Sequence, residues 1–166
     1  MILRVASGRM VRLATAAPDL RDRLLALAAR PEQERFTGRL TETLPAAEAD
    51  PDREPVAILE DGDPVGFFVL HRGPGAGALA PEPRDVLLRA FLVDAAAQGR
   101  GIATRALAAL PDFVAARLPG VRRIVLTVNV ENPVAIRTYK RAGFADSGAL
   151  YLGGPSGPQH VFELWL

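Results

Sequence analysis

The sequence predicts an α+β fold built around one mixed β-sheet, and three observations lead to this prediction. Apolar segments with strand composition lie next to one another both early and late in the chain, which favours antiparallel hairpins. In the middle, a strand, a helix and a strand alternate, which requires a parallel pair with a right-handed crossover. No linker or change in composition divides the 166 residues. We therefore expect a single domain over 1–166, with 1–10 as an N-terminal extension.

The composition excludes several classes of protein. Apolar residues make up 49% of the chain, so a sizeable core is expected. The 20 basic and 19 acidic side chains leave a net charge of +1, which gives no electrostatic support for a nucleic-acid partner. The absence of cysteine excludes disulfides and thiolate nucleophiles. Two histidines are too few for a metal site without carboxylate help, so no metal is expected.

The sequence predicts neither a membrane-spanning stretch nor a signal peptide. No apolar stretch is long enough to span a bilayer, and the first residues lack the features of a signal peptide. We therefore expect a soluble, cytoplasmic protein without a membrane partner. The oligomeric state stays open, with a homodimer among the alternatives.

The first half of the chain is predicted to hold a strand, two helices and a hairpin. Leucines repeat at helical spacing from Leu20 onward, and the segment that follows is more polar but still compatible with a helix. Asp61-Gly62-Asp63-Pro64 is a turn signal between two apolar segments. The predicted elements are a strand at 11–14, helices at 20–30 and 32–44, and strands at 56–59 and 65–70.

The second half carries the strand–helix–strand unit and the final hairpin. Residues 86–93 are apolar on both faces apart from Arg89, as in a central strand that is covered on both sides. Pro111 removes one N–H from the helix that follows, so we expect a kink there or two shorter helices. The predicted elements are strands at 86–93 and 123–130, helices at 102–118 and 133–141, and strands at 150–152 and 160–166.

A glycine-containing turn, Gln98-Gly99-Arg100-Gly101-Ile102-Ala103, links that central strand to the helix. Glycine allows the backbone to approach a phosphate closely, and the helix N-terminus adds unpaired N–H groups and partial positive charge. The spacing fits neither a Walker A motif nor the dinucleotide fingerprint. By itself the turn therefore predicts only a phosphate-bearing ligand, and a turn that binds nothing stays an alternative.

A second motif begins at Asn132, which is a favourable N-cap followed by Pro133 at the first helical position. Asn132, Ala135 and Tyr139 are spaced to lie on one face of the helix. Small Ala135 leaves room for a ligand between the two polar side chains. Without the glycine turn, Tyr139 would be interpreted as a core aromatic with its hydroxyl at the rim.

Together, the two motifs resemble the GNAT superfamily of N-acetyltransferases. Gln98-x-x-Gly101-x-Ala103 matches the acetyl-CoA signature of that family, and Asn132-x-x-Ala135-x-x-x-Tyr139-x-x-x-Gly143-Phe144 matches its later segment. The resemblance implies a mostly antiparallel sheet of six to seven strands with about four flanking helices. It also implies a V-shaped splay between two parallel central strands.

The resemblance further implies acetyl-CoA as co-substrate and direct transfer of its acetyl group to a primary amine. The pantetheine arm would enter the splay, the Val93 N–H would stabilise the oxyanion, and Tyr139 would protonate the departing thiolate. The residues assigned to acetyl-CoA are Phe91, Leu92, Val93, Gln98, Gly99, Arg100, Gly101, Ile102, Ala103, Thr104, Asn132, Ala135 and Tyr139.

Several roles stay open at this level. The general base could be Glu163, His160, a carboxylate of the early helices, or water relayed to an acidic group, which we favour. Arg89 is a candidate for substrate binding, although a buried arginine in a structural ion pair is the stronger interpretation. His160 is the other substrate-binding candidate, because the loop before it borders the acceptor entrance in this fold. His71 is expected to have no chemical role.

The acceptor predicted from the sequence is a small metabolite amine or an amino-acid-like amine. Acetylation of protein N-termini or lysines is the alternative, because acceptor recognition lies in the variable helices and the last loop. A non-catalytic acetyl-CoA sensor and a partner-binding module of the same fold are alternatives of other classes.

Overall fold

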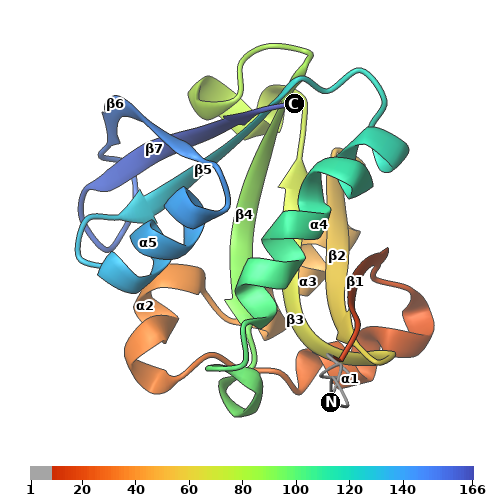
Figure 1. Cartoon of the computed structure of the whole chain (residues 1–166). Helices are drawn as coiled ribbons and strands as arrows, with labels where there is room; N and C mark the ends of the chain where they lie inside the picture. The colour runs from red at the N-terminus through yellow and green to blue at the C-terminus, as the bar shows by residue number, and fades with distance from the viewer. Residues whose placement is uncertain (1–8) are drawn as a thin grey trace, which may run out of the picture.

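The computed structural model describes residues 9–166, and a seven-stranded sheet forms its centre (Figure 1). The spatial order is β1-β2-β3-β4-β5-β7-β6, in which only the β4–β5 pair is parallel. The strands are β1 (Val11–Thr15), β2 (Arg53–Glu60), β3 (Asp63–His71), β4 (Asp85–Val93), β5 (Arg123–Asn129), β6 (Ala145–Tyr151) and β7 (Gln159–Trp165). The predicted α+β fold with a mostly antiparallel mixed sheet is confirmed. The expected extension over 1–10 falls largely outside the described residues.

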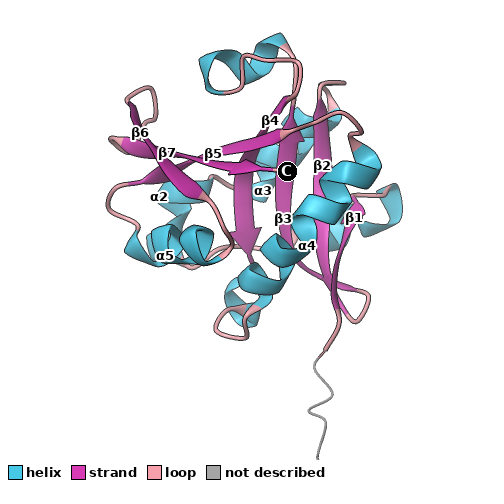
Figure 2. Cartoon of the chain, turned by 45° about the horizontal axis from the view of Figure 1, so that its top comes forward, coloured by secondary structure: helices cyan, strands magenta, loops and turns pink. Residues whose placement is uncertain are grey.

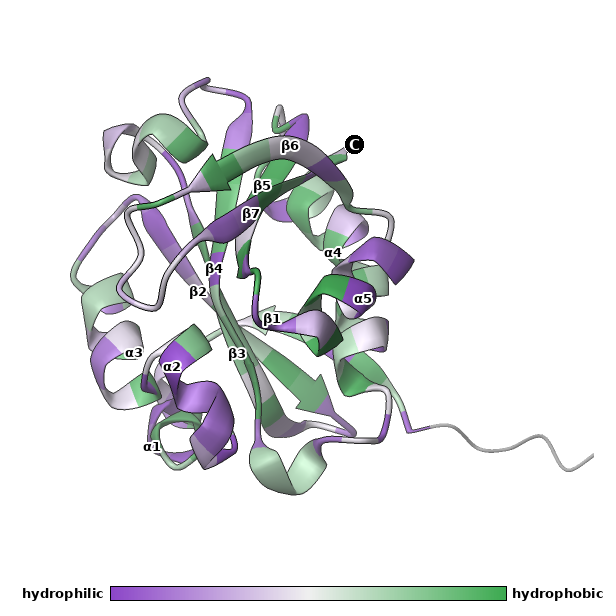
Figure 3. Ribbon diagram, turned by 90° about the vertical axis from the view of Figure 1, so that its left-hand side faces the viewer, coloured by the Kyte–Doolittle hydropathy of each residue, from purple (hydrophilic) through white to green (hydrophobic). Residues whose placement is uncertain are grey.

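Helices cover both faces of this sheet (Figure 2). The α-helices are α1 (Arg21–Leu25), α2 (Glu34–Thr37), α3 (Leu40–Glu48), α4 (Ile102–Arg117) and α5 (Pro133–Arg141). Leu107, Leu110 and Val114 of α4 pack against β2–β5 in the larger core cluster, while Leu24 and Leu44 belong to a second cluster on the other face. Figure 3 shows apolar strands at the centre of the molecule and hydrophilic residues on α2 and on parts of α5. The sheet is therefore buried from both sides, as its apolar composition predicts.

The predicted helices differ from those of the structure in three places. The helix expected at 20–30 is the shorter α1, which ends at Leu25. The single helix expected at 32–44 is divided into a 3-10 turn (Pro31–Gln33), α2 and α3, because Gly38 has a φ of 72° and ends α2. The helix containing Pro111 is one uninterrupted element, Ile102–Arg117, and not two shorter ones. The apolar face of α4 is fully buried in the core, and this packing outweighs the one backbone hydrogen bond that proline removes.

The β6 strand is longer than the predicted 150–152. It begins at Ala145, and six of its seven residues are exposed. Because β6 is the edge strand next to β7, its sequence shows no alternation of apolar and polar residues. Its backbone pairing with β7 holds it in the sheet.

The β4 and β5 strands separate like the arms of a V (Figure 1). They pair only from Asp85–Arg123 to Leu87–Val125, and beyond that point no residue of β4 is paired with β5. Arg123 donates to Asp85 from Nε at 2.8 Å and from Nη2 at 2.5 Å, which joins the strands at the vertex. The V-shaped splay is therefore present, and it leaves one edge of the second half of β4 open.

A β-bulge changes the direction of side chains along β4. Phe67 lies opposite Leu92 but Val69 lies opposite Arg89, so β4 has one extra residue. Ala90 lies at this bulge and has a φ of 57°, which is uncommon for alanine. Without the bulge, Arg89 would share a face with Phe91. With it, Arg89 points to the opposite face of the sheet.

No helix of the described chain, residues 9–166, is long and apolar enough to cross a membrane.

Candidate active site

A cleft of about 1230 Å³ occupies the gap between β4 and β5. Its walls come from the second half of β4, the glycine turn, α5, β5, the β6–β7 loop and the α2 region. Leu87 and Ile102 pack on opposite faces of the sheet, yet both line the cleft. The cleft therefore passes between the two strands from one face of the sheet to the other.

The glycine turn forms one end of this cleft and presents free backbone donors. Gly99 and Gly101 have φ values of 78° and 72°, a conformation that other residues rarely adopt. The first backbone bond of α4 runs from Arg105 N–H to the Gly101 carbonyl at 3.1 Å. Within the described chain, no acceptor takes the N–H groups of residues 99–104. Unpaired donors at a helix N-terminus have the geometry that binds an anion, so the phosphate site at this turn stays a prediction.

The Arg100 side chain, one of those assigned to acetyl-CoA, points away from this turn. Its Nη1 lies 3.0 Å from Oε1 of Glu60, a buried carboxylate that also contacts Arg9 and Arg105. A buried carboxylate needs paired cations, so the guanidinium of Arg100 is drawn behind the turn. Only the backbone of Arg100 remains available to a ligand.

Gln98 fixes the turn against two other segments. Its Nε2 donates to the Val93 carbonyl at 3.0 Å and to Oε1 of Gln33 at 2.7 Å, and Gln33 donates in return to Gln98 Oε1 at 3.2 Å. The side chain that opens the motif therefore positions the end of β4 and is already satisfied by protein partners. Gln33 was missed from the sequence, since nothing in its local pattern indicates this long-range amide pair.

Val93 carries a backbone N–H that faces the open edge of β4. The Asp94 N–H donates to the Val65 carbonyl at 2.8 Å, and hydrogen-bonding residues alternate along an antiparallel pair. The backbone groups of Leu92 therefore face β3, while those of Val93 face the cleft. Of the β4 residues assigned to acetyl-CoA, Leu92 lines the cleft but has no free backbone group to offer.

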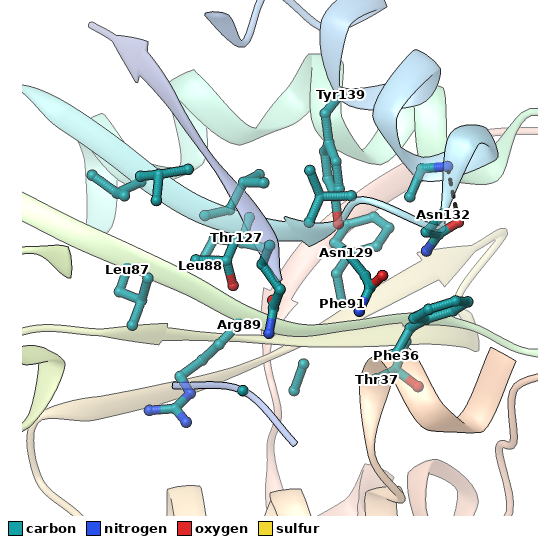
Figure 4. A pocket seen from close by; sticks show the side chains of 18 of the residues that line it. Phe36, Thr37, Leu87, Leu88, Arg89, Phe91, Thr127, Asn129, Asn132 and Tyr139 are labelled. Carbon is teal, nitrogen blue, oxygen red and sulfur yellow. Dashed lines mark hydrogen bonds between the residues drawn. The ribbon is translucent and has the colours of Figure 1, made fainter. Parts of the chain in front are cut away.

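The α5 helix places the second motif across the cleft from β4 (Figure 4). The Asn132 carboxamide oxygen accepts from the Ala135 N–H at 3.3 Å, so its N-cap role is confirmed. Asn132, Ala135 and Tyr139 all line the cleft. In Figure 4 the Tyr139 ring extends from α5 toward Phe91 and Asn129.

Tyr139 is held by aromatic contacts and not by a hydrogen bond. Its ring packs edge-on against Phe91 and Phe144, with centroid distances of 6.1 Å and 5.8 Å. No hydrogen bond joins its hydroxyl to another described residue. Burial raises the pKa of Tyr139, so the phenol stays protonated at neutral pH.

Arg89 lines the cleft without the anionic partner that a structural ion pair requires. No carboxylate of residues 9–166 lies within ion-pair distance of Arg89, and its Nη1 instead contacts Nδ1 of His71 at 3.1 Å. The expected structural ion pair is therefore absent from the described chain. Since the bulge turns Arg89 away from Phe91, its guanidinium reaches the face opposite Tyr139 (Figure 4).

The other histidine is placed away from the cleft. His160 lies on β7 and pairs with Val128 of β5. It points to the same face as Phe162 and does not line the cleft. Its Nδ1 lies 3.7 Å from Asp146 Oδ2. The loop before His160 does line the cleft, but strand alternation turns Val161, and not His160, toward it.

Among the described residues that line the cleft, Glu163 is the only carboxylate. Its Oε2 accepts from Arg123 Nη1 at 3.2 Å, at the closed end of the V. No carboxylate of the early helices lines the cleft. Of the candidate bases, Glu163 and water are therefore the two that the cleft still offers.

Asn129 is a further residue that sequence reasoning missed. It is only 5% exposed, donates to the Ser156 carbonyl at 2.8 Å and accepts from the Glu131 N–H at 2.9 Å. It thus joins the end of β5 to the β6–β7 loop and to the turn before α5. Phe36, Thr37 and Tyr151 also line the cleft and lie in the two regions expected to contact the acceptor.

The family model described as "Acetyltransferase (GNAT) family" matches residues 21–144. The chain belongs to the GNAT family. The match includes the V-shaped gap, the glycine turn and α5, so the two motifs and the fold agree. The protein is accordingly an acetyl-CoA-dependent acyltransferase.

Characterised and uncharacterised relatives share this family. An uncharacterized N-acetyltransferase, YbbJ of Bacillus subtilis (strain 168), is 36% identical over 136 residues, which cover 81% of this chain and 84% of YbbJ. A spermine/spermidine N(1)-acetyltransferase of the same organism is 35% identical over 101 residues, or 61% of this chain and 65% of that relative. The structure of AAC(6')-Ib with paromomycin and acetyl-CoA superposes with a TM-score of 0.75 at 22% identity, covering 93% of each chain. That likeness supports the fold.

Proposed function

We propose that this protein transfers the acetyl group of acetyl-CoA directly to a primary amine of a small metabolite or amino-acid-like acceptor. The observation that carries the proposal is the open cleft between β4 and β5, with free N–H donors at one end and a buried, protonated phenol beside it. The named relatives include a spermine/spermidine acetyltransferase, which acts on a small amine. The proposal includes one domain over 1–166 and a cytoplasmic location.

In the proposed complex, the pyrophosphate binds the N–H groups of residues 99–104. The pantetheine arm then lies along the open edge of β4, where Phe91 and Val93 offer backbone groups and Asn132 faces them from α5. The thioester is thereby brought to the centre of the cleft. Each of these contacts uses a backbone or side-chain group that borders the same cavity.

The chemistry is a direct displacement. The amine nitrogen attacks the thioester carbonyl carbon, and the Val93 N–H stabilises the oxyanion of the tetrahedral intermediate. When the C–S bond breaks, Tyr139 donates its proton to the departing thiolate. The acceptor attacks as the free amine, and the proton that its nitrogen releases once the C–N bond has formed leaves through water, since Glu163 is engaged by Arg123 and His160 lies outside the cleft.

The proposal is tested by measuring free thiol while a panel of amines is supplied with acetyl-CoA. Thermal unfolding with and without acetyl-CoA provides the binding measurement, and a ligand at 100 times its Kd stabilises the fold by about 2.7 kcal/mol. Binding without thiol release from any amine would favour the non-catalytic sensor. Thiol release only with peptides or proteins would favour the protein acetyltransferase. No binding at all would refute the assignment of the cleft to acetyl-CoA.

A further inference from the structure

Resting on the proposed acetyl transfer, the structure assigns a second recognition element to the acceptor. We propose that the acceptor amine carries an anionic group, a carboxylate or a phosphate, which the guanidinium of Arg89 binds. The anionic group distinguishes such an acceptor from polycationic amines such as spermidine, whose charges are all positive.

Arg89 lies on the acceptor side of the cleft. The bulge at Ala90 separates it from Phe91, which contacts Tyr139 on the opposite face. The glycine turn follows the C-terminal end of β4, whereas Arg89 lies at the middle of this strand and on its other face, so Arg89 is not part of the turn. A donor bound from the turn to Tyr139 therefore leaves Arg89 facing the space where an acceptor enters (Figure 4).

The charge of the lining residues favours an anion on this side. Among the described residues, the charged groups that line the cleft are Arg89, Arg123 and Glu163. Arg123 is neutralised by Asp85 and Glu163, whose carboxylates lie at 2.5 Å and 3.2 Å. Within residues 9–166, no carboxylate pairs with Arg89, and no carboxylate that lines the cleft is left unpaired to attract a polycation.

The support behind Arg89 is a buried histidine that accepts a hydrogen bond. His71 is 0% exposed, and Arg89 Nη1 contacts its Nδ1 at 3.1 Å. Arginine has no acceptor, so Nδ1 accepts and His71 is neutral. Burial, followed by Arg53 and Arg89, lowers the pKa of His71, which maintains this state. His71 thus positions one arm of the guanidinium and leaves the other nitrogens free for a ligand.

Arg89 is only partly desolvated, and its side chain still reaches solvent in the cleft. Partial burial and the nearby charge of Arg53 lower the pKa of Arg89. A cation that has lost part of its hydration without gaining an anion is a favourable place for a bidentate carboxylate or phosphate. An acceptor with both groups would place its amine toward the thioester and its anion on Arg89.

The test uses matched amines with the full-length protein. Amino acids are compared with the amines obtained by removing their carboxylate, and O-phosphoethanolamine and spermidine complete the panel. We expect kcat/KM at least tenfold higher for an anionic amine than for its uncharged counterpart. The ratio of carboxylate to phosphate substrates identifies which anion is preferred. Equal or better turnover of spermidine and the decarboxylated amines would overturn the inference.

Variants of Arg89 supply the second arm. Arg89→Gln should raise KM for anionic amines about 10- to 100-fold, since hydrogen bonds to charged groups contribute about 1.5–3 kcal/mol. KM for acetyl-CoA and the turnover of neutral amines should stay unchanged, and Arg89→Lys should restore part of the affinity. Arg12→Gln, on the exposed surface of β1, is the matched control. An equal loss for all acceptors in Arg89→Gln would contradict recognition of an anion.

Binding of the same amines to the complex with CoA, followed by calorimetry, separates this inference from the proposed function. If no amine releases thiol but anionic amines bind selectively and need Arg89, the inference holds and acetyl transfer fails. If thiol is released but selectivity for anionic amines is absent, acetyl transfer holds and the inference fails. If no amine of the panel binds, the inference is overturned.

Discussion

Replacing Tyr139 by phenylalanine tests the proposed general acid with little disturbance of the fold. The ring contacts with Phe91 and Phe144 are kept, and the hydroxyl has no hydrogen-bond partner among the described residues. Removing the hydroxyl therefore leaves no buried group unpaired. We expect the free energy of unfolding to change by less than about 1 kcal/mol, as for other substitutions that break no buried contact.

The catalytic effect of the same substitution should be much larger. Positioned proton transfer contributes about 10²- to 10⁴-fold, which corresponds to a barrier higher by about 2.7–5.4 kcal/mol. We expect kcat to fall by this factor while the Kd for acetyl-CoA stays within about twofold of the unmodified protein. Burial raises the pKa of Tyr139, so the phenol of the unmodified protein should remain a proton donor above its usual range.

The assay is steady-state thiol release, with acetyl-CoA affinity measured separately by calorimetry. An unchanged kcat in Tyr139→Phe would remove Tyr139 from the mechanism. A loss of acetyl-CoA affinity equal to the loss of kcat/KM would make Tyr139 a binding residue and not an acid.

The raised pKa of Tyr139 can be checked separately by measuring unfolding at alkaline pH. The folded pKa lies above the unfolded one, so the contribution of Tyr139 to stability is complete below pH 10 and decreases as pH rises above it.

Three further outcomes are expected. Gly101→Ala should weaken acetyl-CoA binding at least tenfold, because it places a Cβ in the cleft. The control is Gly62→Ala in the β2–β3 turn, where φ is also positive and only the backbone strain of about 1–2 kcal/mol is expected. Equal acetyl-CoA affinities of the two variants in calorimetry would exclude Gly101 from the phosphate site. Asp85→Asn should lower the free energy of unfolding by about 2–3 kcal/mol. The Arg123 hydrogen bond lowers the pKa of Asp85, so the stability from this pair is present above about pH 4 and is lost as pH falls through the folded pKa. An unchanged urea denaturation curve of Asp85→Asn at pH 7 would contradict the stabilising role of Asp85. KM for an anionic acceptor should rise only at a pH below the usual imidazole pKa of about 6.5, where His71 becomes protonated and no longer accepts from Arg89. Burial, Arg53 and Arg89 lower the pKa of His71, and Asp50 and Asp52 oppose this lowering. A KM that stays flat over the whole acidic range in which the protein remains folded would refute the positioning role.

The family and the phosphate end of the cleft could be predicted from local sequence. Gly101 is required by a positive φ, and the N-cap of Asn132 is fixed within one helical turn, so short motifs carry this information. The spacing of Asn132 and Tyr139 also places both on one face of α5. These features depend on chain geometry over a few residues and not on packing between distant segments.

The acceptor side was decided by tertiary structure alone. One extra residue of β4 between the pairings of Phe67 and Val69 turns Arg89 to the opposite face from Phe91, whereas simple alternation along β4 would place both on one face. The partner of Arg100 is Glu60 on β2, that of Gln98 is Gln33, and that of Arg89 is His71. These pairs join residues far apart in the chain.

The sequence by itself therefore determined the donor and the class of reaction, because a phosphate site at a helix N-terminus is a local structure. Only the tertiary structure decided which charged groups face the cleft. A charged side chain turns to whichever buried partner lies within reach, and that depends on strand register. The Arg100 side chain turns to Glu60 and His160 lies outside the cleft, whereas Arg89 lines the cleft and contacts His71.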